Sequence, residues 1–298
     1  MVLTTPTRTL DHPQRDAFQA VTHDGVFHAD DVFAAATLQL LNPETEITRT
    51  RNPLVIAAAH IAFDVGGGDY DHHQPQGGGV RPNGIPYAAF GLIWRDYGKD
   101  LCWDWDVAAE VDRILVQPID AADNGLHLSM PTRDDVHGLN ISGVISMFNP
   151  VDGESFDGQF AIATAVARTI LRRAITNARE RIDGRRVLAS AIANAVDPRI
   201  LVFESFVPGW QETIVRNAPN ALLVVYPSAG TYRVQVIPQE LGKPGVRLPL
   251  PEVWAGLDGE ALISLTGVAD ATFAHRGRFI ACAQSQDGAL TLARLALV

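Results

Sequence analysis

Hydrophobic and polar positions in the first part of the chain predict short strands separated by helices. Segment 20–23 reads as the end of a buried strand, and 32–41 has apolar residues at helical spacing. Asp30 or Asp31 is expected to cap that helix, and Asn42-Pro43 ends it. An alternating strand is predicted over 46–51, and a buried strand over 60–65 ends at three glycines. This order indicates a βαβ unit with a parallel sheet.

In the rest of the chain, the hydrophobic pattern changes once, from helical spacing to short strands. Helices are predicted over 88–97 and 107–116, a turn over 118–125, and helices over 156–177 and 185–196. Beyond Pro198 the pattern predicts short strands and a last helix over 286–297. The predicted strands are 200–203, 221–226, 232–237, 273–275 and 279–282. We therefore predict an α/β chain, with a parallel-sheet catalytic domain over 1–198 and a smaller α+β substrate domain over 199–298.

The composition is that of a globular protein without a membrane span. Its 298 residues are enough for one large domain or two ordinary ones, and the 47% that are hydrophobic are enough to bury a full core. No apolar run is long enough to cross a bilayer, and the charged first twenty residues are unlike a secretory signal. Cys102 and Cys282 are far apart, which argues against a disulfide framework and favours a cytoplasmic protein.

Charge is distributed unevenly along the chain. The net charge is −10, yet residues 201–298 hold seven Lys and Arg against eight Asp and Glu. The first 200 residues hold 17 against 26. An acidic first part suits cation binding. The nearly neutral second part could bind a short anionic ligand, but it lacks the basic surface of a protein that binds long duplexes.

Imidazoles and carboxylates gather at four places where predicted strands meet turns. The four are His23 with His28 and Asp30, then Asp64, then Asp71-His72-His73, and then Asp120 with Asp123. Imidazole nitrogen with carboxylate oxygen suits manganese, zinc or iron, and two such sets allow a two-metal site that hydrolyses phosphate esters. Taken singly, each piece also has an ordinary interpretation as a helix cap, a turn or a packing residue.

The order and context of these pieces resemble the four metal-binding motifs of the DHH phosphoesterase superfamily. The chain is most similar to the Myg (melanocyte-proliferating-gene) type proteins of that superfamily. The similarity extends over 22–31, 64–67, 70–74, 120–125, 148–150, 232–235, 247–251, 273–279 and 288–290. It implies a hydrolase whose second domain folds over the metals and binds the rest of the substrate.

The resemblance also implies a ligand set for two divalent ions. Mn²⁺ is favoured, with Mg²⁺ or Zn²⁺ as alternatives. One ion would be held by His23, His28 and Asp64. The other would be held by Asp30, Asp64, His72 and Asp123, so that Asp64 bridges the two. Asp120 is the alternative to Asp123 as the last aspartate.

Further roles follow from the same resemblance. His73 would donate to a phosphate oxygen, and His73 and Asp64 are the expected catalytic residues. Arg233, Arg247 and His275 would bind substrate from the second domain, although polar residues on strands are often only part of the surface. His28 stands where most of the superfamily has aspartate, which puts a neutral ligand in place of a negative one.

The function implied is hydrolysis of short single-stranded nucleic acid, with RNA favoured, by a 3′-to-5′ exonuclease or an oligonucleotide hydrolase. Two alternatives stay open: an inorganic pyrophosphatase-like hydrolase, and a metal-holding RNA-binding module without turnover. No membrane partner is expected. The oligomeric state is open, and a dimer is possible.

Overall fold

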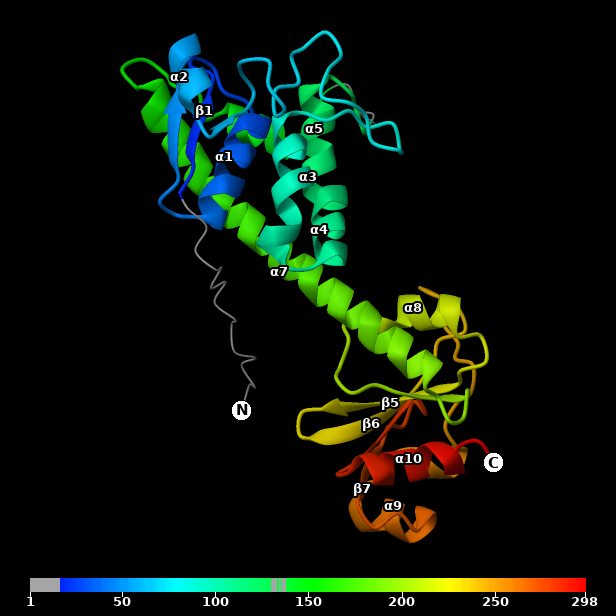
Figure 1. Ribbon diagram of the computed structural model, residues 1–298. Coiled ribbons are helices and arrows are strands. Elements are labelled where there is room, and N and C mark those ends of the chain that lie inside the picture. Colours follow the sequence, from blue (N-terminus) through cyan, green and yellow to red (C-terminus); the bar gives the residue numbers. More distant parts are fainter. Residues whose placement is uncertain (1–16, 130–132, 134, 136–137) are drawn as a thin grey trace. The chain divides into compact units, whose positions relative to one another are not determined.

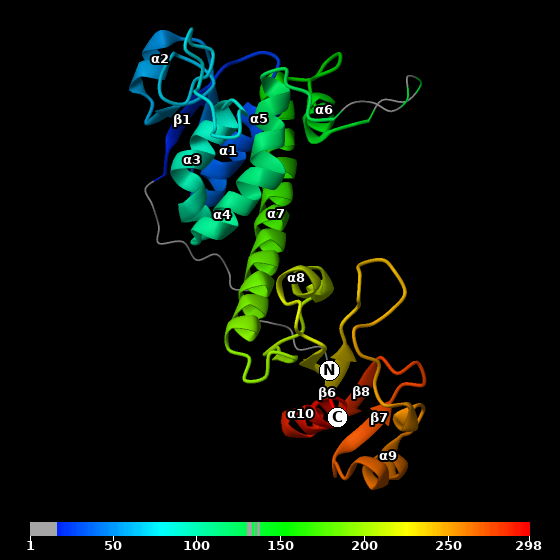
Figure 2. The same cartoon turned by 90° about the vertical axis from the view of Figure 1, so that its right-hand side faces the viewer.

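The computed structural model describes residues 17–129, 133, 135 and 138–298. The chain forms two compact units, Met1–Arg179 and Glu180–Val298, whose elements are labelled in Figure 1 and seen from another side in Figure 2. The division falls inside helix α7 (Phe156–Ala193), upstream of the predicted boundary near Pro198. The assignment of a catalytic domain to 1–198 and a substrate domain to 199–298 stays a prediction.

A three-stranded parallel sheet organises the first unit. Strands β1 (Gln19–Thr22), β2 (Glu46–Arg49) and β3 (Ile61–Ala62) lie in the order β2-β1-β3. The register pairs Thr22 with Arg49 and Val21 with Ala62. The carboxyl ends of the three strands therefore meet at one edge of the sheet, where ligands usually bind. The predicted α/β class with a parallel sheet is confirmed.

Helix α1 (Ala29–Leu41) forms the centre of the first unit. Nearly all its side chains are buried, as expected of a helix that is apolar around its circumference. It packs against α3 (Ala89–Cys102), with the rings of Phe33 and Phe90 5.3 Å apart. The prediction that this helix starts at Val32 was wrong. His28 is the N-cap residue and Asp31 lies inside the first turn, where its Oδ1 accepts the His28 N–H at 3.0 Å.

One predicted turn is helical instead. Helix α4 (Trp105–Val111) runs through the π-helical turn η1 (Asp112–Val116) into α5 (Gln117–Asp123). Pro118 lies in the first turn of α5, where its missing N–H costs little, directly after the wider π turn. The predicted turn over 118–125 therefore begins only after Asp123. Two short helices, α2 (Pro53–Ala58) and α6 (Ile141–Ser146), complete this part of the chain.

The two helices predicted over 156–177 and 185–196 form the single helix α7. Ala178 and Ile182, both within the expected gap between the two helices, are buried. Packing there outweighs the cost of Gly184, about 1 kcal/mol relative to alanine. Although α7 is long, charged residues recur along it. In the described part of the chain, no helix is both long and apolar enough to span a membrane.

The second unit is built on a five-stranded mixed sheet. Its strands are β4 (Ile200–Val202), β5 (Leu223–Ser228), β6 (Thr231–Val236), β7 (Ala271–Ala274) and β8 (Ile280–Ala283), in the order β4-β5-β6-β8-β7. Only β4 and β5 pair in parallel, and the other neighbours are antiparallel. Its helices are α8 (Trp210–Asn217), the 3₁₀ turn η2 (Glu252–Trp254), α9 (Gly259–Thr266) and α10 (Gln286–Leu295).

Both faces of this sheet are buried, because side chains that alternate along β5 belong to two different hydrophobic clusters. Leu223 and Val225 belong to one buried cluster with residues of α9 and α10. Val224 and Tyr226 belong to another with Trp210 of α8. Successive side chains of a strand point to opposite faces, so β5 contributes to both cores. The prediction of a smaller α+β part is consistent with this architecture.

Candidate metal centre

The centre lies at the carboxyl edge of the first sheet. His23 follows β1 directly, and Asp64 lies two residues beyond β3. Because β1 and β3 are parallel neighbours, their carboxyl ends bring the two side chains together. His23 Nε2 is 3.2 Å from Asp64 Oδ2, and both residues are buried.

Asp64 is held in an unusual backbone conformation. Its φ is 57°, in the left-handed region that non-glycine residues rarely adopt, and Gly66 and Gly67 continue the turn with φ of 89° and 72°. The Asp64 N–H donates to Tyr70 O at 3.0 Å, and Asp71 Oδ2 accepts the Gly67 N–H at 2.7 Å. Asp71 thereby fixes the loop that carries both Asp64 and the histidine pair.

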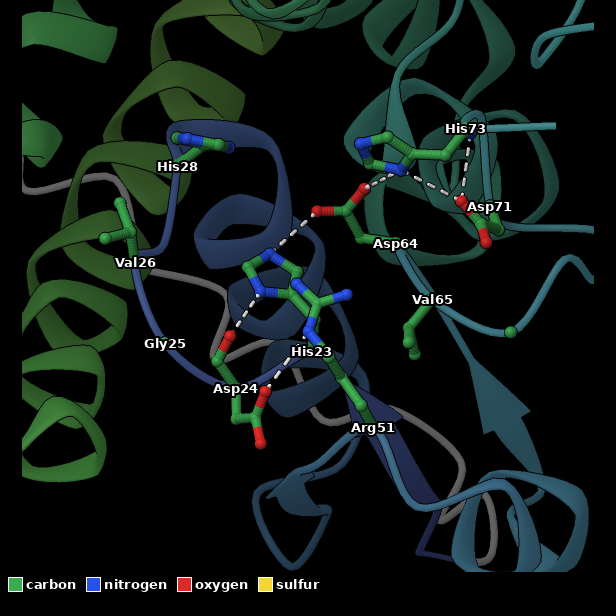
Figure 3. Close-up of a pocket in the computed structure, with 11 residues that line it drawn as sticks. His23, Asp24, Gly25, Val26, His28, Arg51, Asp64, Val65, Asp71 and His73 are labelled. Carbon is green, nitrogen blue, oxygen red and sulfur yellow. Dashed lines mark hydrogen bonds and ion pairs between the residues drawn. The ribbon is translucent and has the colours of Figure 1, made fainter. Parts of the chain in front are cut away.

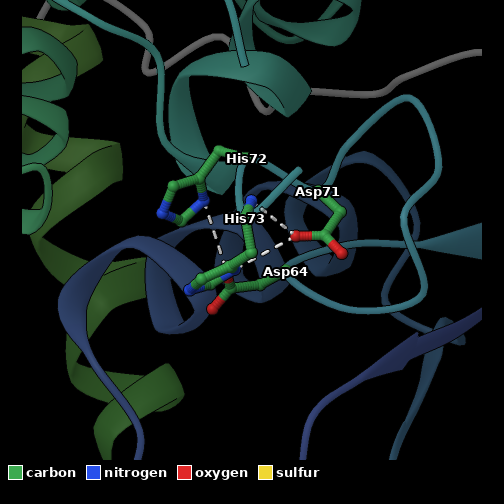
Figure 4. A group of neighbouring side chains, drawn as sticks. All are labelled: Asp64, Asp71, His72 and His73. Carbon is green, nitrogen blue, oxygen red and sulfur yellow. Dashed lines mark hydrogen bonds and ion pairs between the residues drawn. The ribbon is translucent and has the colours of Figure 1, made fainter. Parts of the chain in front are cut away.

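A second imidazole approaches Asp64 through the other carboxylate oxygen. His72 Nδ1 is 3.3 Å from Asp64 Oδ1. Figure 4 draws this contact beside those of Asp71 and His73. His72 Nε2 is 2.8 Å from Asp123 Oδ2, at the end of α5, and Nδ1 is 3.9 Å from Asp30 Oδ2. Asp64 therefore lies between His23 and His72, which is the position expected of a bridging carboxylate.

The remaining predicted ligands form a third group. His28, Asp30 and Asp123 lie close enough to hold one ion, with His28 Nδ1 3.8 Å from Asp123 Oδ1. The family resemblance implied that His28 would share an ion with His23 instead. Asn149, which is distant in the sequence, holds the residue before His28. Its Oδ1 accepts the Phe27 N–H and its Nδ2 donates to Phe27 O.

One further carboxylate belongs to the centre and was missed as a ligand. Asp31 Oδ2 is 3.4 Å from His23 Nε2, and His23, Asp31 and Asp64 form a group in which all three are buried. The sequence offered only a weak signal, since Asp30 and Asp31 are adjacent in a helix start and either could be a cap. Because the helix begins at Ala29, both carboxylates fall in its first turn and reach the centre.

His73 forms a further group that could hold an ion, together with Asp64, Asp71 and His72, and it is more exposed than His72. Its Nδ1 is 3.0 Å from Asp71 Oδ1 and 3.3 Å from Asp64 Oδ1, and 61% of its side chain is exposed. It lines a pocket of about 710 Å³ together with His23, His28, Asp64 and residues of the loops around them (Figure 3). An exposed imidazole at the wall of this pocket is suited to donate to a ligand inside it.

Burial and crowding perturb the acidity of the centre. Burial and the neighbouring carboxylates raise the pKa of Asp30 well above its usual range, and burial raises the pKa of Asp31 to about 7. Burial opposes ionisation of Asp64 too, but the adjacent imidazoles of His23 and His72 lower its pKa to about 2. For His72, burial is outweighed by the adjacent carboxylates of Asp123 and Asp64, which raise the pKa to about 10.

The donor set fits divalent cations. Buried polar atoms that lack a hydrogen-bond partner include Asp30 Oδ1, Asp31 Oδ2, both oxygens of Asp64 and His72 Nδ1. Such atoms are costly to bury unless something binds them, and carboxylate oxygens beside imidazole nitrogens are the ligands of Mn²⁺, Zn²⁺ or Fe²⁺.

Asp120 lies outside this cluster. Its Oδ2 is 2.8 Å from Arg81 Nη2 and its Oδ1 accepts the Gly91 N–H at 3.0 Å. Burial raises its pKa to about 7. Asp120 thus ties α5 to α3 and to the loop containing Arg81, and the geometry favours Asp123 as the last ligand.

The three residues of the second unit that were predicted to bind substrate differ in the contacts that their side chains make. Arg247 donates from Nη1 to Ala218 O and Ala221 O and from Nη2 to Val215 O, at 2.6 to 3.0 Å. These contacts with three carbonyls give Arg247 a structural role, and its contact with substrate stays a prediction. His275 lies against Phe279, with ring centroids 4.2 Å apart, and Arg233 is half-buried on β6.

The fold and the site together define an α/β protein with a candidate centre for divalent metals. Residues 19–297 match the family model MYG1_exonuc, described as "Uncharacterised protein family (UPF0160)". The chain therefore belongs to the MYG1 family, which confirms the resemblance to Myg-type proteins.

Individual relatives agree with this assignment. The chain is 30% identical to the MYG1 protein of Chlamydia trachomatis over 282 residues, covering 89% of this chain and 92% of the relative. It is 30% identical to the human MYG1 exonuclease over 320 residues, covering 93% and 85%. A structure of RecJ from Thermus thermophilus in complex with Mg²⁺ shares 13% identity at a TM-score of 0.27, and the match covers 94% of this chain and half of RecJ.

Proposed function

We propose that this protein is a metal-dependent phosphodiesterase that removes nucleotides from short single-stranded nucleic acid. The observation that carries the proposal is the position of Asp64 between His23 and His72, with further buried carboxylates on both sides. Curated relatives, among them the human one, bear the name exonuclease.

The ligands divide into two sets that share Asp64. His23, Asp31 and Asp64 would hold one divalent ion. From the distances around His72 we infer that Asp30, Asp64, His72 and Asp123 would hold the other, with His28 beside Asp123. When bound, such ions lower the pKa of water and stabilise the charge that develops on the phosphoryl group. We keep Mn²⁺ as the preferred ion, with Mg²⁺ or Zn²⁺ as alternatives.

The protein's own side chains would orient the substrate and move protons. His73 is exposed to the pocket and held by Asp71, so that it can donate to a phosphate oxygen. Asp71 also holds the turn of Asp64, which couples the geometry of the phosphate donor to that of the bridging carboxylate. Charge on the phosphoryl oxygens would thus meet a pre-oriented donor.

The finer specificity is part of the proposal. We infer RNA as the preferred substrate and 3′-to-5′ as the direction, with Arg233 and His275 binding nucleotides beyond the scissile bond. Residues 201–298 carry seven Lys and Arg against eight Asp and Glu, which suits a short strand and not a long duplex. The cytoplasm remains the proposed compartment.

The decisive experiment compares substrates and metals. Pyrophosphate, RNA and DNA dinucleotides to pentanucleotides, and bis(p-nitrophenyl) phosphate are each incubated with Mn²⁺, Mg²⁺, Zn²⁺ or chelator. We expect metal-dependent release of mononucleotides from short RNA, fastest with Mn²⁺. A large preference for pyrophosphate would favour the pyrophosphatase-like alternative, and RNA binding without turnover would favour the non-catalytic module.

A further inference from the structure

The metal pocket contains a cation that the proposed ligand sets leave without a role. Arg51 lines the pocket of about 710 Å³ together with His23, Asp64 and His73 (Figure 3). Among the described residues that line it, Arg51 is the one lysine or arginine.

The backbone fixes Arg51 at the edge where the metal ligands lie. The Thr50 N–H donates to Thr22 O at 2.8 Å, which continues the pairing of β2 with β1 as far as the residue before His23. On the other side, Asn52 accepts the Leu54 N–H at 3.0 Å and starts α2. Arg51 is therefore attached to the same sheet edge as His23.

Arg49 lies two residues before Arg51 and differs from it, because its guanidinium is bound within the fold. Arg49 Nη2 donates to Gly25 O at 2.7 Å, Nη1 pairs with Asp157 at 3.1 Å, and the guanidinium lies 4.7 Å from the Phe160 ring centroid. Its side chain is 2% exposed, whereas 65% of the Arg51 side chain is exposed. Arg49 holds the fold, and Arg51 faces solvent in the pocket.

The one ion pair found for Arg51 in the described part of the chain is weak. Its Nε is 3.2 Å from Asp24 Oδ1, and the Asp24 side chain is 56% exposed. Pairs this exposed contribute little to stability and exchange readily for another anion. The planar guanidinium offers five donors, and bidentate contact with phosphate is one of its preferred interactions.

The charge of the pocket also requires a cation for an anionic substrate. Four carboxylates belong to the two proposed ligand sets, and Asp71 and Asp24 add two more at the pocket. Two divalent ions would bring four positive charges, so a phosphate next to the scissile one would meet net negative charge without Arg51.

We propose that Arg51 binds a second phosphate group of the substrate, adjacent to the one that is cleaved. This inference rests on the proposed function and makes it more specific. The pocket would recognise two consecutive phosphates, and so would select a nucleotide chain over an isolated phosphodiester.

The test is calorimetric binding of product-like ligands to the Mn²⁺-loaded protein. We expect wild type to bind adenosine 3′,5′-bisphosphate about tenfold more tightly than adenosine 3′- or 5′-monophosphate, the effect of one charge-assisted hydrogen bond. Arg51→Gln should lose this preference and keep its affinity for the monophosphates and its metal content by elemental analysis. The proposal is overturned if wild type shows no preference, or if Arg51→Gln retains it.

Two variants separate phosphate binding from other effects. Asp24→Asn removes the partner of Arg51 and should keep or increase the preference for the bisphosphate. Equal losses in Asp24→Asn and Arg51→Gln would mean that the ion pair only holds the loop. Arg216→Gln removes an exposed arginine paired with Glu212 in the second unit and controls for net charge. Hydrolysis of an unphosphorylated dinucleotide by wild type tests the proposed function separately, because that substrate has no second phosphate.

Discussion

The two sides of Asp64 differ in their exposure to solvent. On one side, His23, Asp31 and Asp64 are all buried, at 5%, 0% and 3% exposure. On the other, Asp30 is buried, but the side chains of Asp123 and His28 are 14% and 57% exposed. Metal sites that only hold an ion are closed, whereas catalytic sites keep an open position. The comparison indicates that the closed side holds its ion more tightly than the open side.

Substitution of Asp64, which lies between the two sides, is expected to have the largest effect on metal content and hydrolysis. Asp64→Asn should lose both ions and reduce hydrolysis to background, because Asp64 is the carboxylate common to both sets. Elemental analysis of the purified protein checks this. Asp69→Asn, an exposed aspartate of the same loop, is the matched control and should keep both ions. Full occupancy in Asp64→Asn would refute the shared-ligand assignment.

Removing one imidazole from each side tests the comparison itself. His23→Ala should lose about one ion per chain, since it empties a buried position among carboxylates. His28→Ala, at the exposed position, should keep both ions at saturating metal and weaken affinity by about tenfold, as peripheral ligand contacts do. Titration with Mn²⁺ followed by calorimetry gives both values, and a greater loss in His28→Ala would reverse the roles of the sides.

Separate substitution of His72 and His73 distinguishes metal binding from phosphate binding. His73→Ala should keep the metal content and lower turnover by about a hundredfold, typical of a lost transition-state donor. His72→Ala should lower the metal content as well. If both variants lose metal equally, His73 is a ligand and its role as phosphate donor is excluded.

The perturbed acidity predicts that metal binding releases protons. Without metal, the His72 imidazole with its pKa of about 10 holds a proton at neutral pH, and the Asp31 carboxyl with its pKa of about 7 is partly protonated there. Both must be unprotonated to act as ligands, so affinity should rise as pH increases from about 6 to about 8, by about tenfold per unit for each proton released. Calorimetry in two buffers of different ionisation enthalpy measures the release. Affinity independent of pH would contradict the assigned ligands.

The smallest effect concerns the second unit. Arg247→Ala should destabilise the protein by about 1 to 3 kcal/mol, because three carbonyls lose a charged donor. Arg233→Ala and His275→Ala should instead weaken oligonucleotide binding and leave the melting temperature nearly unchanged. Thermal unfolding and binding of a labelled RNA pentanucleotide distinguish the two outcomes, and a weaker RNA affinity with unchanged stability in Arg247→Ala would restore its substrate role.

The sequence predicted what depends on local patterns. The parallel sheet followed from the order strand, helix, strand, and the proximity of His23 and Asp64 followed from their positions at strand ends. The position of His72 beside them was implied by the family resemblance. The sequence did not predict the helix through Asp123, because a π turn accommodates Pro118 in a way that periodicity does not reveal.

Other features depend on tertiary contacts and could not be predicted. Asp31 joins the centre because His28, and not an aspartate, caps α1. Arg51 faces the pocket and Arg49 does not, although both are arginines near the end of one strand. Arg247 was predicted to bind substrate, and its hydrogen bonds to three carbonyls around the end of α8 could not be predicted.

The most direct test of the two-ion centre is a crystal structure of the Mn²⁺-soaked protein with anomalous data at the manganese edge. Two anomalous peaks should flank Asp64 and share its carboxylate, one in contact with His23 and the other with His72 and Asp123. A single peak, or two peaks of which neither contacts Asp64, would contradict the account.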